Sequence, residues 1–326
     1  MSIPTPIDVY AARRRIADTA VRTPLLRSER LAELVGAETW LKLECVQVTR
    51  SFKIRGALNA VRQLVEQAPA GAAPMVVVTA SAGNHGLALA MAARRAGIRA
   101  VVFAPRQAPR AKLEAIRREH ADLQAVADDY DHAERLALAF AREGGATYVS
   151  PYNDPAVIAG AGTTAVEVLE QQPAADAVIV PTGGGGLLSG VAIAARAIAP
   201  DIRVIGVEAA HNPAFTLALA RGAITPFDAR PTLADGLGGN LEAGSITFEI
   251  ARRLVDTVVT VSEAEIARAM RFLLETEHLV VEGAGAVGVA AVLARKVDGA
   301  LRVPVVLVTG ANVDLATLLA TVEQDR

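Results

Sequence analysis

A lysine stands at the start of an expected helix, in the stretch VTRSFKIRGALNAV at residues 48–61. The N-terminus of a helix carries partial positive charge and prefers anions, so Lys53 is mildly out of place there as a plain charge. The common alternative is a solvated surface lysine. An amine in this position is a candidate for chemistry that uses a nucleophile or a base, which other motifs must then support.

The run PTGGGGLLSG at residues 181–190 places four glycines, Gly183 to Gly186, between a strand and a helix. Without Cβ atoms these residues can turn several backbone N–H groups inward, and the helix N-terminus that follows favours an anion, above all a phosphate. The run is neither a Gly-Lys-Ser/Thr phosphate loop nor a G-x-G-x-x-G turn. A flexible loop is the alternative, but four glycines cost conformational entropy, and we predict a phosphate site.

A second turn, TASAGNHG at residues 79–86, also joins a strand to a helix. Ser81, Asn84 and the N–H groups around Gly83 form a compact set of donors suited to a carboxylate or a ring oxygen. Ser and Asn are equally ordinary helix caps, so this turn alone leaves both interpretations open. We expect His85 to be a structural hydrogen-bonding residue rather than a base.

Two more turns carry polar groups. In VTGANVD at 308–314, Thr309 either offers a hydroxyl to a ring nitrogen or caps a helix. In VEGAGAVG at 281–288, Glu282 precedes a helix of small residues. An acid at a helix N-terminus is usually structural, because it interacts favourably with the helix dipole. Together with Lys53 and the glycine run, these turns describe a ligand with a phosphate, a polar-edged aromatic ring and an aldehyde that an amine can capture. Pyridoxal phosphate is that ligand.

The bulk composition excludes several classes of protein. A net charge of −2 does not indicate binding to nucleic acid or to an anionic membrane. No apolar run reaches the roughly 20 residues that span a bilayer. The histidines lack metal-ligand spacing. A single cysteine, Cys45, and a start without a signal-peptide core lead us to expect a cytoplasmic protein. With 326 residues, of which only 4% are aromatic, we expect two lobes with aliphatic cores.

The elements that must position these motifs alternate along the chain. Short β-branched runs followed by longer helical patterns are typical of a parallel α/β fold. Strands are predicted at residues 75–81, 100–105, 202–209, 256–262 and 303–310, and from residue 176 to the glycine run. Helices are predicted at 84–97, at 110–121, after the glycine run, and from the capping box formed by Ser262 and Glu265. Ligands of open parallel sheets bind at the carboxyl ends of strands, which is where the polar turns lie.

The order and spacing of SFKIRGA, TASAGNH, GGGGLLSG, EGAGA and TGANVD resemble the serine/threonine dehydratase family of fold-type II pyridoxal-phosphate enzymes. The segment PAVIAGAGTTAVEVL at 155–169 also looks like this family, and the resemblance covers essentially the whole chain. It implies a tryptophan synthase β-like α/β fold, with two open, twisted, mostly parallel sheets flanked by helices. It also implies a large cofactor-binding domain from residues 1–71 and 149–326, a small domain from residues 72–148, and the cofactor between them.

The resemblance also implies a role for each matching residue. Lys53 is the Schiff-base lysine and moves the Cα proton, and Thr309 stands where the family has a Ser that faces the pyridine nitrogen. The residues expected to hold the rest of the cofactor are Phe52, Asn84, Gly183, Gly184, Gly185, Gly186, Leu187, Gly236 and Glu282. The residues expected to bind the substrate, with Ser81 also counted as catalytic, are Arg50, Ser81, Ala82, Gly83, Asn84, His85, Ser150 and Tyr152.

Several positions depart from the family pattern. Arg50 replaces a usual Gly, and Ser150 and Tyr152 lie in SPYND where many relatives have His-Pro-Phe-Asp-Asp. Racemases of the group have a second Ser where this chain has Ala82, so we expect racemisation to be minor. Some relatives bind a divalent cation through a Glu, matched by Glu208, and an Asp, replaced here by Ala214, so that no metal is predicted.

The expected reaction is β-elimination from a β-hydroxy amino acid such as L-threonine or L-serine, giving a 2-oxo acid and ammonia. Two alternative substrates stay open. Ser150 removes bulk and would admit phenylserine, whereas the Arg50 cation would select 3-hydroxyaspartate. A β-replacement enzyme and a non-catalytic pyridoxal-phosphate-binding protein are further alternatives. The expected partners are a small amino acid and copies of the same chain, in a homodimer or homotetramer.

Overall fold

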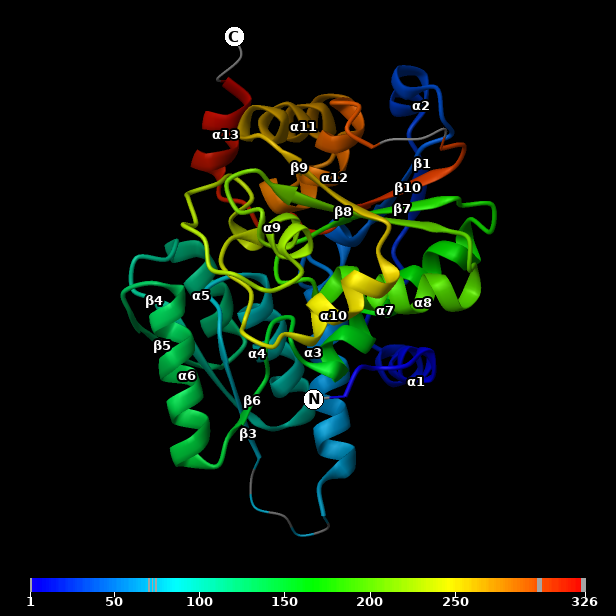
Figure 1. Cartoon of the computed structure of the whole chain (residues 1–326). Coiled ribbons are helices and arrows are strands. Elements are labelled where there is room, and N and C mark those ends of the chain that lie inside the picture. The colour runs from blue at the N-terminus through cyan, green and yellow to red at the C-terminus, as the bar shows by residue number, and fades with distance from the viewer. Residues whose placement is uncertain (1, 70, 72, 74, 298–300, 324–326) are drawn as a thin grey trace.

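The computed structural model describes residues 2–69, 71, 73, 75–297 and 301–323, and Figure 1 shows two lobes, each built on one sheet. In the described chain, the larger sheet has the strand order β1-β2-β10-β7-β8-β9, with β1 antiparallel to β2 and every other pair parallel. Its strands are β1 Leu25–Arg27, β2 Trp40–Leu43, β7 Ala177–Pro181, β8 Arg203–Ala209, β9 Thr257–Val261 and β10 Pro304–Val308.

The smaller sheet is entirely parallel and has the order β5-β4-β3-β6. Its strands are β3 Val76–Ala80, β4 Arg99–Pro105, β5 Asp122–Ala127 and β6 Thr147–Tyr148. The predicted fold class is confirmed, because both sheets are mostly parallel and are covered by helices. The smaller sheet falls within residues 76–148, while the predicted domain limits at 71/72 and 148/149 stay a prediction.

Helices cover both sheets. They are α1 Pro6–Ile16, α2 Glu29–Val35, α3 Lys53–Gln67, α4 Asn84–Ala96, α5 Arg110–Arg118, α6 Tyr130–Gly144, α7 Pro155–Gln171, α8 Gly186–Ile198, α9 Ala214–Arg221, α10 Ile246–Leu254, α11 Glu263–Glu275, α12 Gly283–Leu293 and α13 Leu315–Glu323, with short 3₁₀ turns η1 Glu44–Val46 and η2 Asp235–Leu237. None of the described helices is long and apolar enough to span a membrane.

Alternation along the strands decides which helices cover each face. In β7, Val178 and Val180 join the core formed with α7, α8 and α10, whereas Ala177 and Ile179 join the core formed with α11 and α12. A strand buried on both faces needs apolar side chains in both directions, which is why these strands read as continuous apolar runs. Figure 1 shows α11 and α12 above the larger sheet and α7, α8 and α10 below it.

The predicted elements are present with small shifts at their ends. The helix expected at 84–97 runs to Ala96 and ends on Gly97, which has a left-handed φ of 69°. The capping box of Ser262 and Glu265 is formed at the start of α11. The helix expected to reach residue 121 ends at Arg118, because β5 begins at Asp122.

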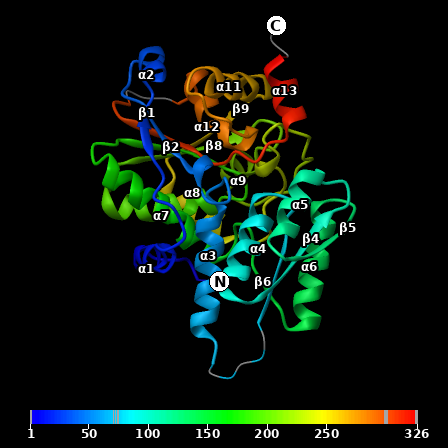
Figure 2. The ribbon, with the colours of Figure 1, turned by 180° about the vertical axis from the view of Figure 1, so that it is seen from behind.

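The helix that begins at Lys53 lies between the two lobes. It packs against α7 on one side and α4 on the other, and Figure 2 shows α3 and α4 side by side. Two glycines make the α3–α7 crossing close: a Cβ on Gly56 would lie 2.8 Å from the Val157 carbonyl oxygen, and one on Gly160 would lie 2.5 Å from the Arg55 carbonyl oxygen. The backbones therefore touch where α3 starts, which fixes the position of Lys53.

A buried network of charges holds the same end of α3. The Arg55 guanidinium donates to both carboxylate oxygens of Glu44 (2.8 Å each) and to both oxygens of Glu167 (2.7 and 2.8 Å). Lys42 Nζ donates to Glu167 at 2.6 Å, and the Thr23 hydroxyl donates to Glu44 at 2.6 Å. Burial alone would raise the pKa of the Glu44 carboxyl, but the charge and hydrogen bonds of Arg55, together with Thr23 and Lys42, outweigh burial and hold the pKa below its usual value.

Removing one member of this network is expected to destabilise the fold strongly. Arg55→Met leaves two buried carboxylates without their main partner, so we predict a loss of about 3–5 kcal/mol in the free energy of unfolding. Urea denaturation of the cofactor-free protein measures the change. The matched control is Arg30→Met, which removes an exposed pair with Glu33 and should cost less than about 0.5 kcal/mol. Equal stability of the two variants would contradict the prediction.

Candidate active site

The chain has four lysines, and their environments differ sharply. Lys42 pairs with Glu167, Lys112 with Asp235, and Lys296 with Glu265. Among the described residues, Lys53 alone of the four has no carboxylate within ion-pair distance. It is therefore the one lysine whose amine is not committed to a structural charge pair.

The Lys53 amine sits in a partly buried, largely apolar setting. Nζ donates a hydrogen bond to the Pro151 carbonyl at 2.8 Å and lies 5.2 Å from the centre of the Phe52 ring. Burial lowers the pKa of Lys53 to about 8, against a smaller opposing effect of the Glu282 charge. At pH 7 about one tenth of the amine is then unprotonated, far more than for an ordinary lysine.

The glycine run lies at the carboxyl end of β7 and leads directly into α8. A Cβ on Gly184 would lie 2.2 Å from the Tyr152 ring, one on Gly185 would lie 2.3 Å from the Phe215 ring, and one on Gly183 would lie 2.9 Å from Leu237 Cα. Packing therefore demands glycine at these positions, a reason that the sequence did not reveal.

The start of α8 also provides anion donors. Gly185 is the N-cap residue, with a left-handed φ of 82°, and within the described chain no side chain caps the first N–H groups. The first turn, which contains Gly186 and Leu187, thus keeps free donors at a positive helix end. These residues fit a phosphate group.

Polar residues from three elements meet beside Lys53. The Asn84 amide donates to Glu282 at 2.6 Å and accepts from the Asn312 amide at 2.6 Å. Burial raises the pKa of the Glu282 carboxyl to about 7. Thr309 is buried, and its backbone carbonyl accepts from the Phe52 N–H at 3.1 Å. The predicted ring-binding residues therefore come together although they are up to 257 positions apart.

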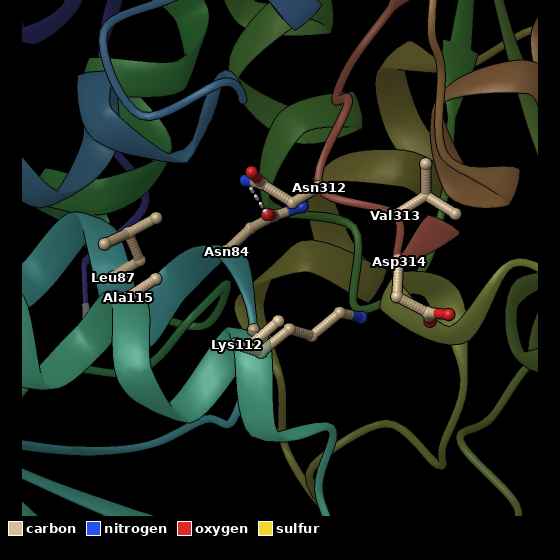
Figure 3. Close-up of a pocket in the computed structure, with 9 residues that line it drawn as sticks. Asn84, Leu87, Lys112, Ala115, Asn312, Val313 and Asp314 are labelled. Atoms are coloured by element: carbon tan, nitrogen blue, oxygen red, sulfur yellow. Dashed lines mark hydrogen bonds between the residues drawn. The ribbon is translucent and has the colours of Figure 1, made fainter. Parts of the chain in front are cut away.

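The donor nest at the start of α4 borders a pocket of about 120 Å³. The Ser81 hydroxyl accepts from the Gly83 N–H at 3.2 Å, so the turn is closed on itself. Figure 3 shows Asn84 and Asn312 joined on one side of this pocket and Lys112 extending toward Asp314 on the other. The pocket separates the smaller lobe from the loop after β10.

Ser150 and Tyr152 are occupied by contacts within the protein. The Ser150 hydroxyl donates to Glu242 at 2.9 Å, and the Tyr152 hydroxyl accepts from the Glu242 N–H at 2.9 Å. The Asn153 amide donates to the same carboxylate at 2.6 Å. The side chains are 5% and 9% exposed for Ser150 and Tyr152, so the segment 150–153 is fixed to the loop before α10.

Arg50 touches the site only through its backbone, whose carbonyl accepts from the Ala311 N–H at 2.9 Å, and Glu208 caps another helix. Arg50 is exposed and has a φ of 58°, the left-handed region that favours the Gly found in relatives. The buried Glu208 carboxylate accepts from the Phe215 and Thr216 N–H groups at 2.7 and 2.9 Å, which caps the start of α9 near Ala214. Over the described ranges, no three His, Cys, Asp or Glu residues gather in a way that would hold a metal ion.

Sequence reasoning missed several residues that shape the site. Asn312 gave only the signal of the polar turn VTGANVD, and Glu242 lies in a loop with no motif. The buried partners Glu44 and Glu167 were also missed, since their contacts with Arg55 span 11 and 112 positions.

The fold and the site define a class of protein. Two lobes built on mostly parallel sheets, a glycine-rich turn that fits a phosphate, and a lysine without an ion-pair partner in the described structure are features of enzymes that use pyridoxal phosphate. Residues 16–310 match the model of the family described as pyridoxal-phosphate dependent enzyme, and the chain belongs to that family. Its cofactor is pyridoxal phosphate, and the glycine run, Asn84 and Lys53 fit that cofactor.

Similar proteins narrow the family. An L-threonine ammonia-lyase of Thermotoga maritima is 42% identical over 94% of this chain and 75% of its own. Human serine racemase is 40% identical over 97% of this chain and 94% of its own. The structure of maize serine racemase superposes with a TM-score of 0.89 at 36% identity, over 99% of this chain and 98% of its own. The resemblance drawn from the sequence motifs is confirmed.

The packing of the glycine run yields a testable prediction. Gly184→Ala drives a methyl group into the Tyr152 ring, so the loop must shift and pyridoxal phosphate should bind at least about tenfold more weakly. Absorbance titration of the cofactor-free protein measures the affinity. Gly144→Ala is the control, because the nearest atoms to its added Cβ are 4.0 Å away. An unchanged affinity in Gly184→Ala would show that the loop does not hold the cofactor.

Proposed function

We propose that this protein is a pyridoxal-phosphate-dependent ammonia-lyase that converts L-threonine or L-serine into a 2-oxo acid and ammonia. The observation that carries the proposal is Lys53, a partly buried lysine without an ion-pair partner in the described structure, with a pKa lowered to about 8. The similarity to proteins named L-threonine ammonia-lyase, at up to 42% identity, supports this choice of reaction.

The chain's own residues provide the cofactor site. Gly183 to Gly186 and Leu187 would hold the phosphate at the start of α8, Asn84 would meet the ring hydroxyl, and Thr309 would face the ring nitrogen. Phe52 and Gly236 would border the ring, and Glu282 orients Asn84 through the bond at 2.6 Å. Bound pyridoxal phosphate supplies the aldehyde that captures an amine and a ring that withdraws electrons from the α-carbon.

Lys53 performs the proton transfer at the α-carbon. Because its pKa is about 8, the amine is basic enough to accept a proton and sufficiently unprotonated near neutral pH to begin doing so. The Pro151 carbonyl holds the amine at 2.8 Å without taking a proton from it. The fixed start of α3 keeps Nζ in one place through the reaction.

The substrate carboxylate is assigned to the turn of Ser81, Ala82, Gly83 and His85 at the start of α4, where backbone N–H groups and the helix end favour an anion. At the side-chain end, Ser150 and Tyr152 are already bonded to Glu242. This leaves little support for a pocket adapted to phenylserine. The exposed position of Arg50 likewise gives little support for selecting 3-hydroxyaspartate.

Racemisation is the second candidate, because serine racemases are 39–40% identical to this chain. Reprotonation on the opposite face of the substrate needs an acid there. The methyl group of Ala82 cannot donate a proton, and we therefore rank elimination above racemisation.

We also propose a homodimer or homotetramer in the cytoplasm. Val46, Val48 and Leu315 expose 37%, 37% and 69% of their surface, and the segments that follow Val48 and precede Leu315 are joined by the bond from the Ala311 N–H to the Arg50 carbonyl. Exposed apolar side chains of this kind are suited to cover by a second copy, which sedimentation velocity would detect. The single cysteine is free and buried, which fits a reducing compartment.

The function is tested by incubating the cofactor-loaded protein with L-threonine, L-serine, L-threo-phenylserine and 3-hydroxyaspartate, and measuring keto acid, ammonia and D-serine. We expect the largest kcat/KM for threonine or serine, and D-serine as a minor product. Lys53→Ala should lose at least about 10³-fold in kcat, because both the base and the amine are removed.

Three results would contradict the proposal: wild-type turnover in Lys53→Ala, D-serine formation as fast as ammonia release, or a phenylserine value at least about tenfold above threonine. Lys296→Ala serves as the control, since it removes a lysine that pairs with Glu265 rather than one that reacts.

A further inference from the structure

The protonation of His85 is fixed by its surroundings. The ring is 2% exposed, and its Nε2 lies 3.2 Å from the Val149 carbonyl oxygen. A carbonyl oxygen only accepts, so Nε2 must carry the proton and donate it. The Thr79 hydroxyl donates to the same oxygen at 2.9 Å, which holds that acceptor in place. Nδ1 is therefore the unprotonated nitrogen of a neutral ring.

This Nδ1 atom is buried without a hydrogen-bond partner in the described structure. A buried acceptor without a donor costs free energy, and most such groups in proteins are paired. Burial, together with the Lys53 charge, lowers the pKa of His85 to about 3. The imidazole is therefore held in its neutral form, in which Nδ1 is a hydrogen-bond acceptor.

The Lys53 amine is a candidate donor for this atom. His85 bonds to Val149 and Lys53 bonds to Pro151, two positions along the short segment that follows β6. The two side chains approach the same stretch of backbone from α4 and α3, which pack together. After burial, the Lys53 charge is the next largest cause that lowers the pKa of His85.

We propose that His85 is a positioning residue for Lys53: Nζ exchanges between the Pro151 carbonyl and His85 Nδ1 in the free protein, and Nδ1 accepts its hydrogen bond when the lysine works on the substrate. The inference rests on the proposed function only in taking Lys53 as the reacting amine. A neutral acceptor favours the ammonium form, so it holds Lys53 after the lysine has taken the α-proton. Glu282 is the charged group that acts on Lys53, and its charge raises the pKa of the amine.

Two substitutions separate this role from a purely structural one. His85→Gln places an amide N–H where Nε2 was, which keeps the bond to Val149 but removes the acceptor at Nδ1. His85→Asn places an amide oxygen where Nδ1 was, which keeps the acceptor but loses the bond to Val149. A structural residue would tolerate Gln and suffer from Asn, whereas a positioning residue shows the reverse in catalysis.

We expect His85→Gln to keep its thermal midpoint and lose about tenfold or more in kcat, with KM within about twofold. His85→Asn should lose thermal stability but keep kcat within about threefold. A second readout uses the cofactor-free protein, where the rate of pyridoxal phosphate uptake rises with pH as Lys53 loses its proton, with a midpoint near 8 in the wild type. His85→Gln should lower this midpoint by about half a unit or more, and His85→Asn should not.

The proposal is overturned if His85→Gln has the wild-type kcat and the wild-type uptake midpoint. It is also overturned if His85→Asn loses about tenfold or more in kcat, a result that can be measured even if the Gln variant fails to fold. If the wild type releases no ammonia from any substrate, the proposed function fails, while the uptake midpoints still test the contact between His85 and Lys53.

Discussion

The buried contact between Arg55 and two carboxylates is the constraint on which the site depends. Arg55 lies two residues after Lys53, and it binds Glu44 directly after β2 and Glu167 on α7 with four hydrogen bonds of 2.7–2.8 Å. With Lys42 the network balances two positive and two negative groups. Such a network is tolerable in a protein interior only when every member is satisfied, and satisfied networks are rigid. The contacts of Arg55 with Glu44 and Glu167 therefore fix the first turn of α3 in place.

Fixing this turn has chemical consequences. Glu44 and Glu167 are committed to Arg55, and the described contacts of the Lys53 amine are uncharged: the Phe52 ring and the Pro151 carbonyl. Desolvation without a close counter-ion lowers the pKa of the amine. Four charged groups pair with one another in the buried network, and Lys53 stays outside it, available for reaction. The glycine run is held in turn by Tyr152, whose segment also carries the Pro151 carbonyl.

Much of this arrangement could be predicted from the sequence. The alternation of β-branched runs and helices predicted the parallel sheets, and the run of four glycines and the helix start at Lys53 lay where they were expected. Local patterns did not reveal β5, whose sequence DLQAVA is only partly apolar. They also gave no sign of contacts between distant positions, such as Asn84 with Asn312 or Ser150 with Glu242. Those pairs depend on how the lobes meet, which no short motif encodes.

The central claim is that Lys53, and no other lysine, is the amine that holds the cofactor. It is tested most directly by treating the cofactor-loaded protein with borohydride, which fixes the pyridoxyl group on that amine, and by locating the added mass in peptides. The account predicts the label on the peptide that contains Lys53 alone, since Lys42, Lys112 and Lys296 are each ion-paired. A label on any of those three lysines, or a loaded protein without any label, would contradict it.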